Sequence, residues 1–351
     1  MNKFDERYEI RLAEKEDIDS IMQFINDHWK EGHIMSRSRE LFEYEYVDGE
    51  DVNFVLAIDR STHSIEGIFG FLRCSHTNEF DKRHIWGSIW KVNTERENMP
   101  LLGIELAKRV CPMTESSQQI GNGANPNTTV PLRKLFFKEK TVKMIQYYFL
   151  NHRMEQYHIA VIQDKWEPKI KTASANIRLQ QFYTIEEVKA HFNIEKLDAI
   201  PYKDNWYLGK RYFQHPWYTY RVYGLAKESG RTEALMVTRE IECKGSRILR
   251  IVDYMGNQKL FSELGSLFFE WTSQSEYEYI DFYVYGFDEQ AVYDAGFRKR
   301  DTEDRNIIPN YFEPFLQENV DIWAHYKKEG TTFFKADGDQ DRPNIISSRQ
   351  G

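Results

Sequence analysis

A strand, a turn and a helix follow one another over residues 84–110, and this unit constrains the fold more than any other stretch of the chain. Residues 84–92 mix apolar, β-forming side chains with polar ones, which predicts a strand. Pro100 suits the first turn of a helix, where its missing N–H is not needed. The apolar face of that helix recurs every four residues, at Leu102, Leu106 and Val110. Such a unit is typical of α/β proteins.

The turn of this unit has features of an anion-binding site. The first backbone N–H groups of a helix have no partner within the helix, and they favour phosphate. Gly103 and Ala107 are small residues on the helix, so a ligand or another backbone can approach it closely. The unit therefore suggests a phosphate site, although it also occurs in α/β proteins as plain architecture.

Composition narrows the class of protein. A chain of 351 residues with 41% hydrophobic and 15% aromatic residues can build two domains with sizeable cores. The net charge of −8 argues against nucleic acid as a partner. The three cysteines have no metal-ligand spacing and predict no disulfide framework, which suits the cytoplasm. No apolar run approaches the roughly 20 residues that cross a membrane, so we expect no membrane association.

The second half of the chain repeats the order of predicted elements found in the first half. The first series of strands and helices covers residues 8–13, 14–30, 53–59, 65–74, 84–110, 119–122, 130–137 and 142–150. Residues 33–46 form either a second helix or a loop on the substrate side. The second series covers residues 217–226, 233–241, 247–253, 256–268, 277–284 and 290–297.

This repetition predicts an α/β (α+β) fold of two tandem domains, each a mixed, mostly antiparallel sheet flanked by helices. We expect the first domain at residues 1–151, a connector at residues 152–205 and the second domain at residues 206–351.

The order of elements resembles the GNAT acyltransferase superfamily, whose members bind acyl-coenzyme A. Asn98–Gly103 occupies the place of the family's pyrophosphate turn and keeps its final glycine. The family's last helix often ends in Tyr-x-x-x-Gly-Phe. Residues 132–137 match that ending in shape, with Leu132 in place of the tyrosine, and Gly296-Phe297 forms a similar ending in the second half.

The resemblance implies that acetyl-coenzyme A, or another acyl-coenzyme A, is the co-substrate. We expect it in the first domain, because Asp253 stands in the corresponding turn of the second domain and would repel a phosphate. Backbone N–H groups at the end of the central strand would polarise the thioester carbonyl. The expected coenzyme-binding residues are Trp90, Lys91, Val92, Asn98, Met99, Pro100, Leu101, Leu102 and Gly103.

Two polar segments near the C-terminus are candidates for the acceptor site. Residues 308–315 combine prolines and aromatic rings with Glu313, and residues 333–344 hold three aspartates followed by Arg342. We expect Asn310–Glu313 and Asp337–Asn344 to meet in space, facing the thioester end of the first domain. Glu313 or Asp339 would be the catalytic carboxylate, and Arg342 would bind an anionic part of the acceptor. The expected substrate-binding residues are Asn310, Tyr311, Asp341, Arg342 and Asn344.

Two other interpretations of the aspartate-rich segment stay open. It is either a solvated acidic tail or, with Asp337, Asp339 and Asp341, part of a calcium loop. The calcium pattern requires a glycine after the third aspartate and a later glutamate, whereas Gly338 falls between the first two aspartates. We therefore predict no metal site.

Both C-terminal segments resemble parts of tandem GNAT-like proteins of bacterial surface-polysaccharide synthesis. That resemblance implies an acyl-coenzyme A-dependent N-acyltransferase acting on an amino-sugar, for example a nucleotide-linked one, or on another small amine. One alternative is a Fem-type aminoacyl or peptidyl transferase, a group that typically carries a helical arm and basic surfaces. Another is a GNAT-like binding module without catalysis, which the missing Arg and Gln residues of Asn98–Gly103 favour.

Overall fold

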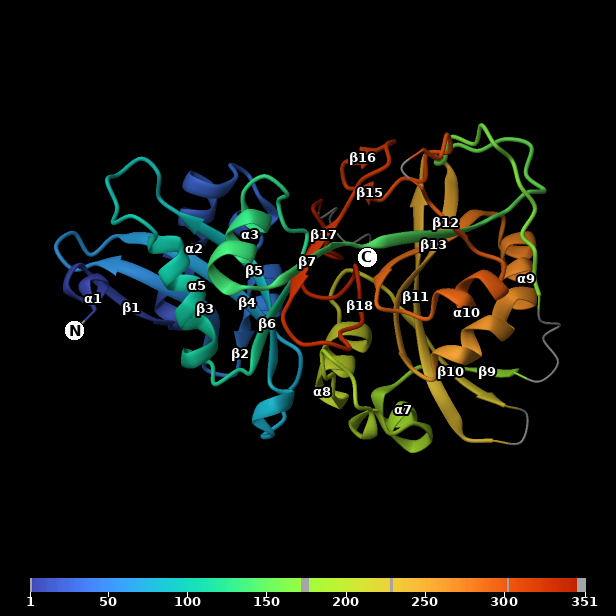
Figure 1. Cartoon of the computed structure of the whole chain (residues 1–351), viewed down its shortest axis with the longest axis horizontal. Helices are drawn as coiled ribbons and strands as arrows, with labels where there is room; N and C mark the ends of the chain where they lie inside the picture. The colour runs from blue at the N-terminus through green and yellow to red at the C-terminus, as the bar shows by residue number, and fades with distance from the viewer. Residues whose placement is uncertain (1, 172–176, 228–229, 302, 346–351) are drawn as a thin grey trace. The chain divides into compact units, whose positions relative to one another are not determined.

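The chain folds into two mixed sheets, each flanked by helices (Figure 1). The computed structural model describes residues 2–171, 177–227, 230–301 and 303–345. The described chain divides into two compact units. The first contains the chain up to Val142, Trp323–Lys328 and the chain from Gly338, and the second contains Lys143–Ile322 and Glu329–Asp337. The predicted fold class is therefore confirmed.

In the first sheet β5 and β6 run parallel, whereas β1, β3, β4 and β5 pair antiparallel in that order and β17 pairs antiparallel with β6. A short strand, β2 (Val47–Asp48), pairs with β3 outside the main order. The order is β1 (Tyr8–Ala13), β3 (Asp51–Asp59), β4 (Ile65–Arg73), β5 (His84–Val92), β6 (Gln118–Asn122), β17 (Trp323–Tyr326) and β7 (Lys140–Lys143).

The second sheet has the same character, with one parallel pair, β12 and β13, among antiparallel neighbours. A short strand, β18 (Phe333–Phe334), pairs with β13, and a separate hairpin joins β15 (Tyr311–Phe312) to β16 (Phe315–Leu316). The order is β14 (Arg298–Lys299), β8 (Ile145–Leu150), β13 (Tyr277–Tyr285), β12 (Ser246–Gly256), β11 (Thr232–Cys243), β10 (Arg221–Lys227) and β9 (Ile177–Phe182).

Helices flank each sheet. The α-helices of the first unit are α1 (Lys3–Arg7), α2 (Ile18–Phe24), α3 (Ile34–Arg37), α4 (Arg39–Tyr46), α5 (Leu102–Met113) and α6 (Thr129–Leu132). Those of the second unit are α7 (Ile185–His191), α8 (Asn205–Leu208), α9 (Gly265–Ser275) and α10 (Glu289–Asp294). The 3₁₀ and π segments are Lys15–Asp17, Ile25–Trp29, Phe80–Lys82, Arg133–Phe137, Ile194–Lys196, Gly209–Phe213 and Gln258–Leu264.

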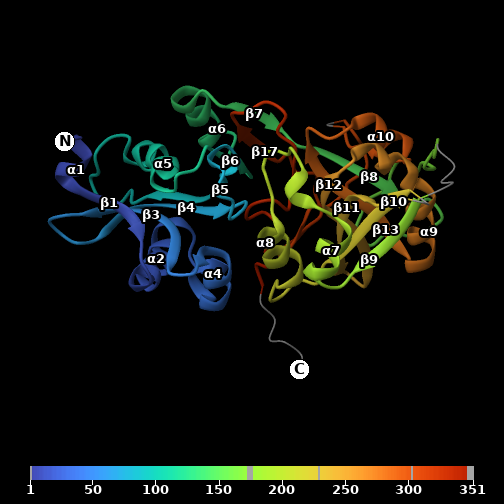
Figure 2. The same ribbon diagram turned by 90° about the horizontal axis from the view of Figure 1, so that it is seen from below.

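Helix α5 packs on the first sheet through the face that the sequence predicts. Leu102, Leu106 and Val110 are buried, in one core cluster with side chains of the sheet. Full burial of each leucine side chain stabilises the fold by about 1.5–3 kcal/mol. Figure 2 shows α5 on one face of this sheet and α2 and α4 on the other. Residues 33–46, for which the sequence left a helix or a loop open, form α3 and α4.

Two strands join a sheet far from their neighbours in sequence. Strand β8, which the sequence predicts as the last strand of the first series, pairs with β13 and β14 in the second sheet. Strand β17 pairs with β6 in the first sheet. The compact units consequently divide at Val142 and not at residue 151. Whether residues 1–151, 152–205 and 206–351 are the domains that fold separately stays a prediction.

Candidate functional site

The two parallel strands at the centre of the first sheet pair only over their first three residues. His84 pairs with Gln118 and Trp86 with Ile120, and β5 then continues to Val92 without β6 beside it. Gly338 lies between the separating strands, since a Cβ atom placed on it would be 3.3 Å from Trp86 Cβ and 3.4 Å from Asn122 Oδ1. Backbone groups along this edge of β5 are therefore not used by β6.

A β-bulge interrupts β5 where the two strands separate. Trp90 pairs with Phe69 and Gly87 with Phe71, so Ser88 and Ile89 together face Gly70 on β4. A bulge of two residues against one locally turns the strand and re-aims its side chains. The bulge therefore lies where Ser88, on the central strand, contacts the chain that returns from the C-terminal part of the sequence.

Asp339 lies at this bulge and is held by several hydrogen bonds. Ser88 Oγ donates to Asp339 Oδ2 at 2.8 Å, and Gln340 Nε2 donates to Asp339 Oδ1 at 3.0 Å. The buried Tyr46 hydroxyl lies 2.5 Å from Ser88 Oγ, and it is the donor when Ser88 donates to Asp339. A carboxylate with only 11% of its side chain exposed is thus fixed beside the central strand.

Arg342 is the cation of this cluster, and it contacts two carboxylates. Its guanidinium pairs with Asp339, lies 3.3 Å from Glu45 Oε2, and donates to the backbone oxygen of Asp339 at 2.9 Å. Burial by itself lowers the pKa of Arg342, but Glu45, Tyr46 and Asp339 together raise it above the ordinary value. Burial lowers the pKa of the neighbouring His33 to about 4. The cluster therefore holds a permanent cation between two carboxylates, with a neutral imidazole beside it.

The aspartate-rich segment is not a solvated tail. Asp337 and Asp341 are buried, and Asp339 has the contacts described above. A charged side chain is buried at this level only when other groups compensate for its lost hydration. The interpretation of this segment as a solvated acidic tail is therefore wrong.

Side chains of the first unit already hydrogen-bond to the predicted pyrophosphate turn, Asn98–Gly103. Tyr8 donates from its hydroxyl to Asn98 Oδ1 at 2.9 Å and accepts from the Met99 N–H at 3.0 Å. Asn98 Nδ2 donates to the buried carboxylate of Glu66 at 3.1 Å. An exposed residue in left-handed backbone geometry, Leu101, precedes α5. Arg96 pairs with Glu66 at 3.0 Å and compensates its negative charge. A coenzyme phosphate at this turn would depend on the N–H groups of α5.

Gly103 has a structural role in this turn. A Cβ atom at this position would lie 3.2 Å from Trp90 Nε1 and 3.2 Å from Val92 Cγ2. Trp90 Nε1 also donates to the Gly103 carbonyl at 2.9 Å. The glycine thus lets α5 approach the end of β5, where Lys91 and Val92 are half-buried. The roles of residues 90–92 and 98–103 in coenzyme binding stay predictions.

The other predicted site residues fall in both units. Asn310, Tyr311 and Glu313 belong to the second unit, whereas Asp341 and Asn344 belong to the first. Asn310 is buried, and neither its amide nitrogen nor its amide oxygen has a hydrogen-bond partner in the described part of the chain. Glu313 accepts from the Tyr218 hydroxyl at 3.4 Å. The predicted meeting of the two C-terminal segments stays a prediction.

Sequence reasoning did not single out Glu45, Tyr46 and Ser88. Glu45 and Tyr46 end helix α4, and the sequence signalled only that residues 33–46 form a helix or a substrate-side loop. Ser88 is one polar residue in a strand that alternates polar and apolar residues. Its hydrogen bond with Asp339, 251 positions away, leaves no signal in the local sequence.

The described residues form neither a cluster of metal ligands nor a membrane-spanning helix. No group of three or more His, Cys, Asp or Glu side chains in the described ranges could hold a metal ion. None of the helices that the structure describes is both long and apolar enough to span a membrane.

Comparison with known proteins identifies the fold. No family model and no curated protein matches the chain. A GCN5-related N-acetyltransferase from Anabaena variabilis matches with a TM-score of 0.51 and 13% identity, over 91% of this chain and 72% of that one. An Enterococcus faecalis protein of unknown function, named a probable N-acyltransferase, matches with a TM-score of 0.53 and 9% identity, over 90% and 71%. The chain has the GNAT fold.

Proposed function

We propose that this protein is an acyl-coenzyme A-dependent N-acyltransferase whose catalytic centre is the bulge of β5. The observation that carries the proposal is the Asp339 carboxylate, hydrogen-bonded to Ser88 where β5 leaves β6. The GNAT fold supports the reaction class, because both structural neighbours are named as acetyl- or acyltransferases. Acetyl-coenzyme A is the proposed donor, and no metal takes part.

In the proposed reaction, the acceptor amine attacks the thioester carbonyl. A C–N bond forms, the C–S bond breaks, and the thiolate of coenzyme A leaves and takes up a proton from solvent, while Asp339 afterwards releases its proton to solvent. Asp339 accepts the proton that the amine loses, since a neutral amine is needed for attack. Backbone N–H groups of β5 between the bulge and Val92 stabilise the negative charge on the carbonyl oxygen. Arg342 is a positioning residue that keeps Asp339 oriented.

The contacts of Arg342 differ from the acceptor contact that the sequence suggested. Its guanidinium is engaged by Glu45 and Asp339. An anionic group of an acceptor would have to share it with these carboxylates, so we assign the positioning role to Arg342 first. Glu313 remains the alternative catalytic carboxylate, and Tyr218 is its partner.

The proposed acceptor is a small amine, with an amino-sugar of bacterial surface-polysaccharide synthesis as the specific proposal. This part rests on the resemblance of residues 308–315 and 333–344 to tandem GNAT-like proteins. The cytoplasm is the proposed location, because acyl-coenzyme A and nucleotide-linked sugars are made there. The competing proposal is a binding module without catalysis, favoured by the missing Arg and Gln residues of Asn98–Gly103.

The test has two steps. Calorimetry with acetyl-coenzyme A comes first, and an absence of binding would overturn the transferase proposal. Release of free thiol from acetyl-coenzyme A is then followed with a panel of amino-sugars and nucleotide-amino-sugars. Asp339→Asn should lower kcat/KM by about 10²–10⁴-fold, as loss of a general base does, while acetyl-coenzyme A still binds.

The matched control for this variant is Asp81→Asn. Asp81 is an exposed carboxylate of the same unit, with 93% of its side chain accessible, and its substitution should leave kcat/KM unchanged. Full activity of Asp339→Asn would exclude Asp339 as the base, and the same assay on Glu313→Gln would then test the alternative.

A further inference from the structure

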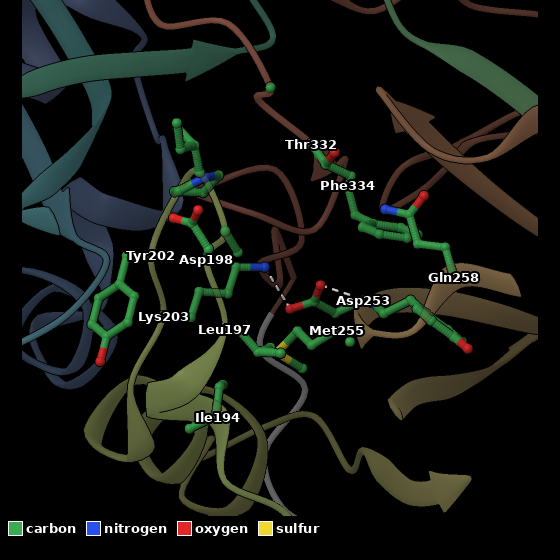
Figure 3. A pocket seen from close by; sticks show the side chains of 16 residues that line it. Ile194, Leu197, Asp198, Tyr202, Lys203, Asp253, Met255, Gln258, Thr332 and Phe334 are labelled. Carbon is green, nitrogen blue, oxygen red and sulfur yellow. Dashed lines mark hydrogen bonds and ion pairs between the residues drawn. The ribbon is translucent and has the colours of Figure 1, made fainter. Parts of the chain in front are cut away.

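The second unit contains a partly open pocket that the proposed reaction does not use. It lies where β12 ends, between residues 253–258 of that strand and turn, residues 194–203, and residues 330–334 beside β18. Its volume is about 300 Å³. Figure 3 shows Asp198 and Gln258 on two sides of it, with Lys203 and Asp253 between them. A small organic molecule would fit this space.

Buried charges form the floor of the pocket. Lys203 Nζ lies 2.6 Å from Asp253 Oδ2 and 2.6 Å from Asp337 Oδ1. The Tyr212 hydroxyl also donates to Asp253 Oδ2, at 2.6 Å. Lys203 has three N–H groups and two carboxylate partners among the described residues, which leaves one N–H for a ligand.

The charges around the pocket do not cancel. Asp253 and Asp337 together exceed the single positive charge of Lys203, and the exposed carboxylate of Asp198 at the wall adds another negative charge. An anionic ligand such as a diphosphate would be repelled, whereas a protonated amine would be attracted. The pocket therefore selects by charge as well as by size.

Uncharged groups on the wall complement a polar ligand. Gln258 Oε1 accepts from the Asp288 N–H at 2.8 Å, while its amide nitrogen has no partner in the described chain. Thr332 is half-buried beside it, and the ring of Phe334 provides an apolar surface. Hydroxyl groups of a ligand could accept from Gln258 Nε2 and from the third N–H of Lys203.

We infer that this pocket binds a small, hydroxylated ligand that carries a protonated amine, with the ammonium group beside the exposed carboxylate of Asp198. The inference rests on the charges and the cavity of the second unit alone. It does not depend on acyl transfer at Asp339, so binding is measured directly and not through turnover.

Glucosamine is a suitable probe, because glucose differs from it by one hydroxyl in place of the ammonium group. Calorimetry at neutral pH with the full chain should detect glucosamine and show glucose at least tenfold weaker. N-acetylglucosamine, which has lost the charge, should also be at least tenfold weaker. If glucosamine does not bind, or if glucose binds equally well, the inference is overturned.

Two variants test the location of the ligand. Asp198→Asn removes one exposed charge from the wall and should weaken glucosamine binding by about twofold to fivefold, as an exposed ion pair of up to about 1 kcal/mol predicts. Ala199→Trp places a large side chain from an exposed position of the lining and should abolish binding. Glu186→Gln is the control, since Glu186 is exposed on α7 outside the pocket. Unchanged affinity in both Asp198→Asn and Ala199→Trp would exclude this pocket as the binding site.

Discussion

Lys203 pairs with two buried aspartates of the second unit, Asp253 and Asp337. It is 93% buried, and its ammonium group neutralises one of two aspartates that are themselves inaccessible to water. Lys203→Met leaves Asp253 and Asp337 without a counter-charge and should lower the free energy of unfolding by about 3–5 kcal/mol. Urea denaturation measures this loss. Lys189→Met removes a lysine that is half exposed on α7, and its effect should stay within about 0.5 kcal/mol. Equal effects of the two variants would contradict the role of Lys203.

Asp337 should make stability depend on pH in a direction unusual for an aspartate. Burial is the largest effect on it and raises its pKa to about 6, although Lys203 opposes this change and Asp253 adds to it. The folded form therefore binds the proton more tightly than the unfolded form, whose pKa is about 4. Stability from this group is present below about pH 4 and is lost as the pH rises through about 6.

The difference between the native chain and Asp337→Asn isolates this effect, because other groups titrate in both proteins. The free energy of unfolding of the native chain, relative to the variant, should fall between about pH 4 and pH 6 and then level off. Urea denaturation at several pH values gives this difference. A relative stability that increases over the same range would show that the pKa of Asp337 is lowered by Lys203 and not raised by burial.

At the scale of elements, a strained residue, Leu101, directly precedes helix α5. Leu101 has a φ of 67°, a left-handed conformation that costs an L-residue about 1–2 kcal/mol, and 55% of it is exposed. Leu101→Gly should therefore raise the free energy of unfolding by up to about 1 kcal/mol, since little apolar burial is lost. Leu135→Gly is the matched control at an exposed leucine within the helical segment Arg133–Phe137, where glycine should destabilise by about 1 kcal/mol. Thermal unfolding of both variants measures the two changes in stability, which should be opposite in sign: Leu101→Gly stabilises and Leu135→Gly destabilises.

The sequence predicts most elements but not all of their partners. The hairpin of β3 and β4, the central strand β5, and the apolar face of α5 follow from alternation and four-residue spacing, and the structure confirms them. The pattern of β8 predicts a strand equally well, yet periodicity cannot say which sheet a strand joins. The same limit applies to the site: Asp339 was a candidate from its segment, whereas Ser88 and Tyr46 join it only through the returning chain.

At the scale of the whole molecule, the first unit is completed by chain from the far end of the sequence. Strand β17 pairs with β6 through Ala324 and His325, and the following return places Gly338 beside Trp86. The ring of His325 packs against Gly121, because a Cβ atom placed on Gly121 would lie only 2.2 Å from His325 Nε2. Without these segments, β6 would be an open edge next to the central strand, and the Asp339 cluster would be missing.

Residues 1–151 alone should consequently fail to unfold as one cooperative transition. The same unit reassembled as a single chain, with residues 1–142 joined by flexible Gly/Ser linkers to residues 323–328 and 338–345, should recover a cooperative urea transition. Hydrogen exchange over Gly121 and Asn122 on β6, the residues that β17 pairs with, provides a local readout, and slow exchange there is expected only when β17 is present. If residues 1–151 unfold as cooperatively as the reassembled unit, the domain boundary predicted from the sequence holds, and the returning chain contributes only the loop that carries Asp339.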